Sequence, residues 1–269
     1  MILERIGLIA GNGKFPILFT QAAHLKGVEV IAVAIKEETS EELEKFADRI
    51  YWISVGEFRK LFEAFKNEGI KRVAMAGQIK HILLFKDIEL DDELKSLLQK
   101  VKDKKTDTLL GAVANRFESL GIELVNSVEY LVDFLATHGT IAKREPTSEE
   151  WEDIRFGRTI AERIVSLDIG QTVVVKNKAI LAIEAIEGTD EAIRRGGNLG
   201  KNGVVVVKLS KGKNQDMRFD VPVIGPRTID VLIEIRGSCL AIESGKTLII
   251  DRDECIEKAD AAGIAIVGI

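Results

Sequence analysis

The stretch Arg5–Lys26, RIGLIAGNGKFPILFTQAAHLK, decides the fold of the N-terminal half. Its first six residues, Arg5–Ala10, are a short apolar run that predicts a buried strand. The glycine-containing segment Gly11–Pro16 ends that run, and Phe15–Lys26 predicts a helix. A strand, a tight turn and a helix in this order are typical of the first unit of a parallel α/β sheet.

The alternation of strand and helix continues through the next hundred residues. The predicted strands are Val28–Ala34, Ile50–Ser54, Arg72–Ala76 and Ile122–Val125. The predicted helices are Glu57–Asn67, Asp91–Lys102 and Asp107–Ser119. We therefore expect an N-terminal domain over residues 1–138, with a Rossmann-like parallel sheet and helices on its faces.

The periodic pattern breaks at Gly139–Ser148, around Pro146, which predicts a domain boundary. Thr147 and Ser148 precede an acidic turn, as at the start of a capped helix. The predicted strands that follow are Thr172–Val175, Ala179–Ile183, Val204–Lys208, Thr247–Ile250 and Ile264–Val267, with helices near Asp190–Arg195 and Asp251–Ala261. We expect a smaller C-terminal mixed α/β domain over residues 148–269, and a cleft between the two domains.

Composition excludes several classes of protein. A net charge of −5 and a pI near 5.5 argue against a general nucleic-acid binder. The chain has no secretory leader pattern at its start, and no apolar run is as long as a membrane span, which needs roughly 18 residues. Cys239 and Cys255 give neither a metal spacing nor a disulfide framework, which indicates a reduced, cytosolic setting.

Two loops of the N-terminal half are candidate ligand contacts. Gly11 and Gly13 follow the first strand, and Gly77, Gln78 and Lys80 follow the fourth. In parallel sheets ligands collect beyond the carboxyl ends of strands, so both loops can line one crevice and contact a phosphate or another part of a substrate. The alternative is a plain strand-to-helix turn and a solvated loop. The three-glycine dinucleotide fingerprint is incomplete, which disfavours a nicotinamide enzyme.

Two further segments have both a structural and a functional interpretation. Asp107, after two lysines, caps a predicted helix or contacts a polar group of a substrate. The segment Ile183–Asp190 places Glu187, Gly188 and Thr189 between a strand and a helix. Helix capping explains Thr189 and Asp190, while the acids that precede Arg194 and Arg195 leave a substrate or metal role open.

The run Lys208–Asp230, KLSKGKNQDMRFDVPVIGPRTID, places four cations, Lys208, Lys211, Lys213 and Arg218, around Asp216 and Asp220. Cations beside carboxylates are what phosphoryl transfer needs, since cations hold phosphate oxygens and acids hold Mg²⁺ or orient water. If the run is extended, Asp216, Arg218 and Asp220 project to one face, which must be solvent or a polar cleft. A solvated hairpin is the alternative. The shift to VPVIGP predicts a fixed, buried turn through Pro222, Gly225 and Pro226.

Six segments together resemble the LpxI-type UDP-2,3-diacylglucosamine pyrophosphatase family. These are GLIAGNGKFP, AGQIK, KKTDTLL, LDIGQTVVV, AIEAIEGTDEAIRR and KNQDMRFDVPVIGPRTID, in the order in which they occur in the chain. The resemblance implies a metal-dependent enzyme of lipid A synthesis that cleaves its substrate to UMP and 2,3-diacylglucosamine 1-phosphate (lipid X). It also implies Mg²⁺ (or Mn²⁺), two domains that close over the substrate, and a cytoplasmic protein in peripheral contact with the inner membrane.

The resemblance also implies roles for particular residues. Asp220, which opens the DxPxIG block, is the expected catalytic acid, with Asp216, Gln215 and the Glu187–Thr189 loop in the same cleft. The expected metal ligands are Asp220, Asp216 and Glu187. Lys208, Lys211 and Arg218 are expected to neutralise phosphoryl charge. A non-catalytic sugar-nucleotide or lipid-binding module is the competing hypothesis, and association into a homodimer is left open.

Overall fold

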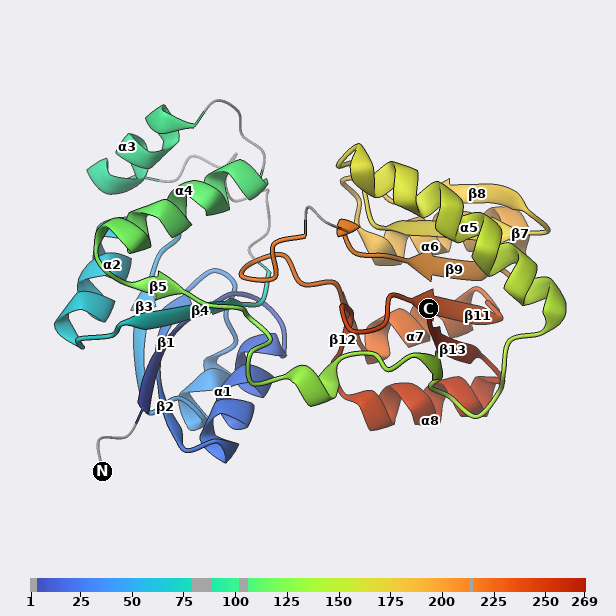
Figure 1. Ribbon diagram of the computed structural model, residues 1–269, viewed down its shortest axis with the longest axis horizontal. Coiled ribbons are helices and arrows are strands. Elements are labelled where there is room, and N and C mark those ends of the chain that lie inside the picture. The colour runs from blue at the N-terminus through green and yellow to red at the C-terminus, as the bar shows by residue number, and fades with distance from the viewer. Residues whose placement is uncertain (1–3, 79–88, 102–105, 213–214) are drawn as a thin grey trace. The chain divides into compact units, whose positions relative to one another are not determined.

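The computed structural model of the 269-residue chain describes residues 4–78, 89–101, 106–212 and 215–269. It consists of two compact units, each with its own sheet and its own core (Figure 1). Met1–Leu131 and Met217–Asp220 make up the first unit, and Val132–Asp216 and Val221–Ile269 make up the second. The expected α/β class, with one parallel and one mixed sheet, is confirmed.

The first unit is a doubly wound parallel sheet. Its strands are β1 (Glu4–Ala10), β2 (Val28–Ile35), β3 (Arg49–Ile53), β4 (Arg72–Ala76) and β5 (Glu123–Leu124), in the order β3-β2-β1-β4-β5. Its helices are α1 (Phe15–Leu25), α2 (Phe58–Asn67), α3 (Asp92–Lys100) and α4 (Thr106–Ser119), with a 3₁₀ helix, η1, at Glu41–Lys45. The winding direction reverses between β1 and β4, which makes the carboxyl ends of these two strands the topological switch point.

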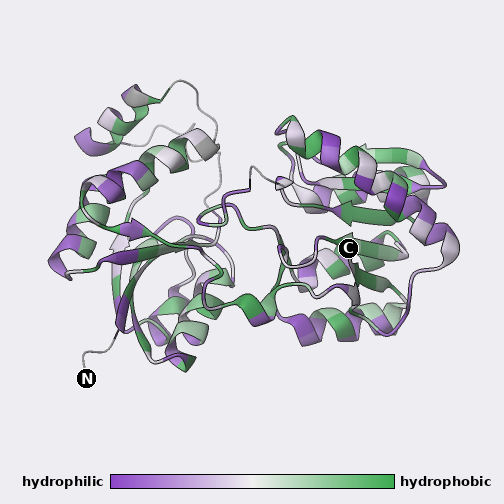
Figure 2. Cartoon of the chain, in the orientation of Figure 1, coloured by the Kyte–Doolittle hydropathy of each residue, from purple (hydrophilic) through white to green (hydrophobic). Residues whose placement is uncertain are grey.

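Both faces of this sheet are buried, which explains the near-continuous apolar strands. On one face, Phe65 of α2 and Phe117 of α4 pack against Val73 and its neighbours. A Cβ atom at Gly7 would lie 2.6 Å from the ring of Phe65, so a glycine in β1 lets this ring reach the sheet. Figure 2 shows that the strands are largely apolar and that the helices carry polar residues on their outer sides.

A buried carboxylate joins three segments at the edge of the first unit. Glu68 accepts hydrogen bonds from Tyr51 at 2.5 Å and from Arg5 at 2.8 Å, and it also pairs with Arg49. These contacts, Tyr51 foremost, lower the pKa of Glu68 from 4.5 to about 2. The carboxylate therefore stabilises the fold when it is ionised.

We expect Glu68→Gln to destabilise the protein at neutral pH and to make less difference in acid. Because the pKa of Glu68 is lower in the folded state, its contribution is complete above about pH 4.5 and is lost as the pH falls towards 2. Thermal melts of both proteins at pH 6, 4 and 3 measure this. A melting-temperature difference that stays constant across these pH values would contradict the assignment.

The second unit has a six-stranded mixed sheet in the order β6-β13-β11-β9-β7-β8. Its strands are β6 (Gly139–Thr140), β7 (Thr172–Lys176), β8 (Ala179–Ile183), β9 (Val205–Lys208), β11 (Cys239–Ile242) and β13 (Ala265–Gly268); β10 (Val223–Ile224) and β12 (Leu248–Ile249) form a separate parallel pair. Its helices are α5 (Ser148–Ser166), α6 (Thr189–Gly200), α7 (Pro226–Glu234) and α8 (Arg252–Ala262), with a 3₁₀ helix, η3, at Val132–Phe134.

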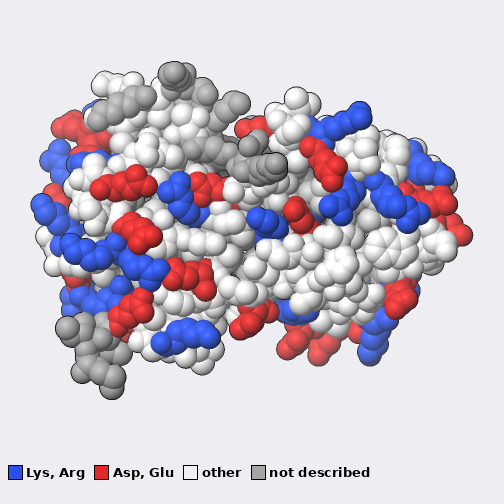
Figure 3. Space-filling view, in the orientation of Figure 1, with Lys and Arg blue, Asp and Glu red and all other residues white. Residues whose placement is uncertain are grey.

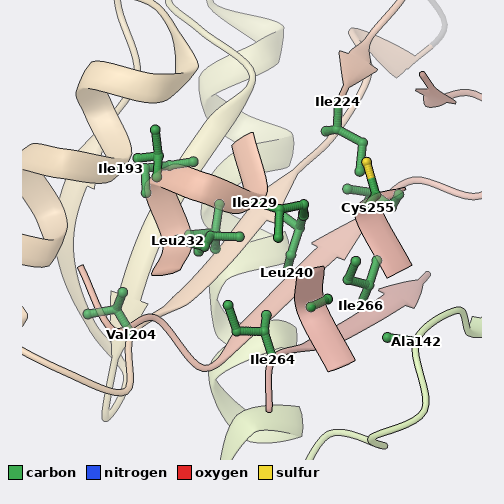
Figure 4. Packing of buried hydrophobic residues seen from close by; sticks show 14 of the residues in the cluster. Ala142, Ile193, Val204, Ile224, Ile229, Leu232, Leu240, Cys255, Ile264 and Ile266 are labelled. Atoms are coloured by element: carbon green, nitrogen blue, oxygen red, sulfur yellow. The ribbon is translucent and has the colours of Figure 1, made fainter. Parts of the chain in front are cut away.

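Strands β9, β11 and β13 run parallel, and β7 runs antiparallel to β9. Helix α5 packs on one face of this sheet, over Val205 and Val207. Helices α6, α7 and α8 contribute to the core on the other face, where Ile193, Leu232 and Ile266 pack with their neighbours (Figure 4). Residues that alternate along β9 therefore face different helices.

The capped helix expected after Pro146 is confirmed as α5. The Thr147 hydroxyl accepts from the backbone N–H of Glu150 at 3.2 Å, and the Glu150 carboxylate accepts from the backbone N–H of Thr147 at 2.8 Å. This reciprocal capping box satisfies two backbone donors that a helix start leaves unpaired. The same carboxylate pairs with Arg144 at 2.8 Å, which fixes the chain that enters the helix.

Two local interpretations are wrong, and one strand was missed. The VPVIGP segment is not a turn, since it forms the short strand β10 and then begins α7 at Pro226. The segment Asp216–Asp220 is not extended, because Met217–Phe219 form a turn. Strand β11 was not expected at all. Its four apolar residues are too few to show a period.

Surface charge and helix composition add two findings. Acidic and basic side chains are interspersed over the face drawn in Figure 3, where the described residues form no broad basic surface of the kind that binds nucleic acid. Among the helices in the described ranges, none has both the length and the apolarity to cross a membrane.

Candidate active site

The loops at the switch point of the first unit pair with each other. Gly11 donates to the carbonyl of Ala76 at 2.9 Å, and Asn12 donates to the carbonyl of Gln78 at 2.7 Å. A Cβ at Gly11 would lie 2.7 Å from the Gln78 carbonyl oxygen, and one at Gly77 would lie 2.6 Å from that of Asn12. Close backbone approach therefore explains Gly11 and Gly77 without a ligand. Their contact with substrate stays a prediction.

Polar side chains lie beside these loops, just after the carboxyl ends of β1 and β2. The Asn12 amide donates to the buried carboxylate of Glu38 at 2.9 Å, and the Thr39 hydroxyl donates to the carbonyl of Ala10 at 2.6 Å. Gly13 is exposed, and among the described residues, its chain neighbours aside, no atom lies within 4 Å of where its Cβ would be. Of the described residues, Asn12 and Thr39 therefore provide polar groups at these strand ends, and Gly13 provides exposed backbone. The sequence showed no role for Asn12 or Thr39.

Two predicted site residues of this half fall outside what the structure describes. Lys80 lies in residues 79–88, outside the described ranges. Asp107 is the second residue of α4, inside its first turn and not at the N-cap that the sequence predicted, and its side chain is not described. Both stay predictions.

The segment Met217–Asp220 belongs to the first unit although it lies late in the sequence. Ser127, just after β5, donates its backbone N–H to the carbonyl of Met217 at 2.9 Å and its hydroxyl to the carbonyl of Arg218 at 2.5 Å. Phe219 packs against the first core, and Arg218 pairs with Glu118 at 3.7 Å. These contacts hold Met217–Phe219 in a turn, so the segment Asp216–Asp220 is not extended. They place Asp220 directly after a fixed turn, half-buried.

The second unit gathers polar residues at one edge of its sheet. The carboxyl ends of β8 and β9 lie there with the amino end of β7, because β7 runs antiparallel to both. Gln171, Glu184 and Lys208 occupy these three strand ends. Gln171 and Glu184 come from two of the sequence segments on which the family resemblance depends, and Lys208 lies five residues before a third.

Lys208 is the central residue of this edge. It follows Val207, which faces α5, so its side chain lies on the α6 side of the sheet. Lys208 is only 5% exposed, and its ammonium donates to the Thr189 hydroxyl at 2.7 Å. Within the described part of the chain this is its one hydrogen bond, and no carboxylate forms an ion pair with it. A buried ammonium is costly without a counter-charge, so the site favours an anion.

The backbone beside Lys208 adds to the attraction for an anion. Thr189, the partner of Lys208, is the first residue of α6, and Gly188 precedes it with φ of +86°. The N–H groups at a helix start carry partial positive charge, and Lys208 lies next to them. Asp190 in the same turn is already paired with Arg227 at 2.8 Å.

Gln215 provides a second unused donor. Its side-chain oxygen accepts from the backbone N–H of Lys211 at 2.6 Å, which fixes the orientation of the amide. Its Nε2 atom is buried and has no hydrogen-bond partner among the described residues. The Lys211 ammonium lies 3.0 Å from the carboxylate of Asp168. Buried amide donors are normally satisfied, so this donor is available to an oxygen of a ligand.

The three expected metal ligands, Glu187, Asp216 and Asp220, have different surroundings. One Glu187 oxygen pairs with Arg195 at 2.5 Å, and the other accepts from the backbone N–H of Ala185 at 3.2 Å. Asp216 and Asp220 belong to different compact units. Among the residues that the structure describes, no group of three or more His, Cys, Asp or Glu side chains is placed to hold a metal. Both oxygens of Glu187 thus already have partners, and the metal role of Asp216 and Asp220 stays a prediction.

Glu184 is one of the two acids before Arg194 and Arg195 for which the sequence left a substrate or metal role open, although only Glu187 was chosen as a site residue. Its carboxylate accepts from the Thr189 hydroxyl at 2.9 Å and from the backbone N–H of Gln171 at 3.3 Å. The acid that reaches Thr189 and Lys208 is therefore Glu184, three residues before the predicted Glu187. A usable signal was its position directly after β8, at the same edge as Lys208.

Comparisons with known proteins agree with the sequence resemblance. A family model described as the LpxI N-terminal domain matches residues 5–134, and one described as the LpxI C-terminal domain matches residues 137–267. A relative from Caulobacter vibrioides, named UDP-2,3-diacylglucosamine pyrophosphatase LpxI, is 29% identical, with 99% of this chain and 98% of the relative covered.

Similarity to solved structures is distant. The biotin carboxylase domain of a Hydrogenobacter thermophilus 2-oxoglutarate carboxylase has a TM-score of 0.29 and 13% identity, covering 74% of this chain and 41% of that one. An N5-carboxyaminoimidazole ribonucleotide synthetase has a TM-score of 0.28 and 13% identity, covering 65% and 34%. The chain thus spans less than half the length of these proteins, and no conclusion rests on them.

Proposed function

We propose that this chain, which belongs to the LpxI family, hydrolyses the pyrophosphate bond of UDP-2,3-diacylglucosamine. The proposed products are UMP and 2,3-diacylglucosamine 1-phosphate (lipid X). Support comes from the family models, which together span nearly the whole chain, and from the named activity of the Caulobacter relative.

The observation that carries the proposal is the buried ammonium of Lys208 at the end of β9, which makes one hydrogen bond to the described residues, that to Thr189. A diphosphate offers several anionic oxygens to such a group, which then stabilises the charge that develops on the phosphate as the bond breaks. The buried donor of Gln215 is a second proposed contact. Lys211 and Arg218 are proposed as outer cations, although both already contact carboxylates.

The reaction is an addition of water across a phosphoanhydride. A water oxygen bonds to one phosphorus, the bond from that phosphorus to the bridging oxygen breaks, and the bridging oxygen leaves with the other phosphate. We propose Asp220 as the acid–base group that takes or supplies the proton, with Asp216 assisting. Proton transfer by a placed carboxylate typically contributes about 10²- to 10⁴-fold to the rate.

Dependence on Mg²⁺ or Mn²⁺ is part of the proposal. Proteins often hold Mg²⁺ through one or two carboxylates together with substrate phosphates, so a protein cluster of three is not required. Asp216 and Asp220 are the proposed carboxylates. When bound, the metal would neutralise charge on the diphosphate.

Chelation is expected to abolish UMP release from UDP-2,3-diacylglucosamine, and added Mg²⁺ or Mn²⁺ is expected to restore it. The assay compares the purified enzyme before and after treatment with EDTA, with a melting curve to confirm that the fold persists. Full activity in excess EDTA would show that the reaction needs no divalent cation.

Association is also part of the proposal. Acyl chains of the substrate partition into a bilayer, so we propose peripheral contact with the inner membrane, with a homodimer as the working assembly. Flotation with vesicles that contain the substrate, and light scattering of the purified protein, measure these two properties separately.

A further inference from the structure

Three side chains form a continuous hydrogen-bonded chain at the edge of the second sheet. The ammonium of Lys208 lies 2.7 Å from the Thr189 hydroxyl, which lies 2.9 Å from one oxygen of Glu184. The direction of each bond follows from chemistry. Lysine has no acceptor, so Thr189 accepts from Lys208, and a carboxylate only accepts, so Thr189 donates to Glu184.

The far end of this chain is held by backbone. The second oxygen of Glu184 accepts from the N–H of Gln171 at 3.3 Å, and the backbone N–H of Glu184 donates to the carbonyl of Thr172 at 2.8 Å. A Cβ at Gly170 would lie 2.0 Å from the carbonyl oxygen of Glu184, so only glycine permits this approach. Glu184 is therefore anchored to the start of β7 through both its carboxylate and its backbone.

The Thr189 hydroxyl separates the Glu184 carboxylate from the Lys208 ammonium, and this has an electrostatic consequence. A direct ion pair between Glu184 and Lys208 would occupy the ammonium and weaken its attraction for a substrate. With the Thr189 hydroxyl between them, the carboxylate polarises the oxygen that receives the Lys208 proton, and the remaining ammonium protons stay available. The buried Lys208 ammonium is therefore stabilised by Thr189 and still has protons to donate to a ligand.

We propose that Glu184 and Thr189 are positioning residues, which hold the Lys208 ammonium in place for the diphosphate without touching it themselves. This proposal rests on the proposed function. It also revises the role expected for Thr189, which the sequence resemblance placed in contact with substrate.

Thr189→Val is the sharpest test, because it removes the hydroxyl at nearly constant volume and no side-chain cap of α6 is lost. Losing a hydrogen bond to a charged group typically costs about 10- to 100-fold, so kcat/KM is expected to fall by about that factor. Thr189→Ser keeps the hydroxyl and is expected to recover activity to within about threefold. Glu184→Gln is expected to give an intermediate loss, since the amide oxygen still accepts but carries no charge.

A double-mutant cycle separates positioning from general structural damage. In a Lys208→Met background, Thr189→Val is expected to change kcat/KM by less than about twofold, because both changes act through the same ammonium. Glu191→Gln, on the same first turn of α6 and paired with Arg194 at the surface, is the matched control and is expected to leave activity unchanged. Independent, multiplicative losses in the cycle would overturn the proposal, as would full activity of Thr189→Val.

Binding of inorganic pyrophosphate, measured by calorimetry, distinguishes failure of this inference from failure of the proposed function. If the wild type does not hydrolyse the nucleotide but Thr189→Val still weakens pyrophosphate binding with rescue by Thr189→Ser, the positioning role stands and the proposed reaction falls. If the wild type hydrolyses its substrate and Thr189→Val binds and turns over normally, the positioning role falls.

Discussion

Asp220→Asn is expected to lower kcat by about 10³-fold while KM changes little, because a proton-transfer group acts on the transition state more than on bound substrate. Asparagine has nearly the same volume but removes both the ability to exchange a proton and the charge that would help to hold Mg²⁺. The turn before it is fixed by Ser127 and Phe219, so the backbone position is expected to survive the change. Steady-state kinetics of UMP release provide the measurement.

A matched control lies ten residues further along the chain. Asp230 is an exposed aspartate of α7 that pairs with Lys258 at 2.8 Å. Asp230→Asn is expected to retain wild-type kinetics. If Asp220→Asn also turns over at a near-normal rate, with a normal melting curve, the acid–base role assigned to Asp220 is wrong.

Lys208→Met is expected to produce opposite effects on activity and stability. The aliphatic length is kept while the charge is removed, so kcat/KM is expected to fall by about 10²- to 10³-fold through loss of transition-state stabilisation. The melting temperature is expected to rise by about 2–4 °C, since a buried cation without a carboxylate partner costs free energy in the unliganded fold. Kinetics and calorimetric melts on the same preparation test both effects.

Lys176 in the same sheet is the control. Its ammonium donates to the carbonyls of Gly200 at 3.0 Å and Asn202 at 2.7 Å, at the opposite end of β7 from the candidate site. Lys176→Met is expected to lower the melting temperature and to leave kcat/KM unchanged. A Lys208→Met protein that is both less stable and fully active would show that Lys208 is a structural residue.

The N-terminal fold was predictable because its strands are buried on both faces and therefore stand out as apolar runs. The predicted Arg5–Ala10 and Arg72–Ala76 correspond closely to β1 and β4. In the C-terminal half, α7 was missed because Pro226 was interpreted as part of a turn, although proline is also favoured in the first turn of a helix.

The sequence predicted which segments contribute to the candidate site. It did not predict which side chains contact one another there. Alternation cannot decide which of Glu184 and Glu187 faces the site once the strand has ended, and the structure assigns Glu184 to Thr189. The turn before Asp220 depends on Ser127 and on the first core, about ninety residues earlier in the chain. No local pattern encodes such distant contacts.

Gly11 and Gly77, at the carboxyl ends of β1 and β4, also show what a sequence alone cannot decide. Gly11 and Gly77 matched a phosphate-binding interpretation, yet each lies against the backbone of the other loop. A sequence shows that a position needs glycine more readily than it shows what approaches that glycine. Backbone pairing and ligand contact impose the same requirement on the residue.

Product analysis in ¹⁸O-labelled water tests the account most directly. Purified protein is incubated with UDP-2,3-diacylglucosamine, and the products are identified by mass spectrometry. We expect UMP and 2,3-diacylglucosamine 1-phosphate in equal amounts, with one ¹⁸O atom in the phosphate of only one of them. Recovery of intact substrate, or of UDP with the free diacylated sugar, would contradict hydrolysis of the pyrophosphate bond.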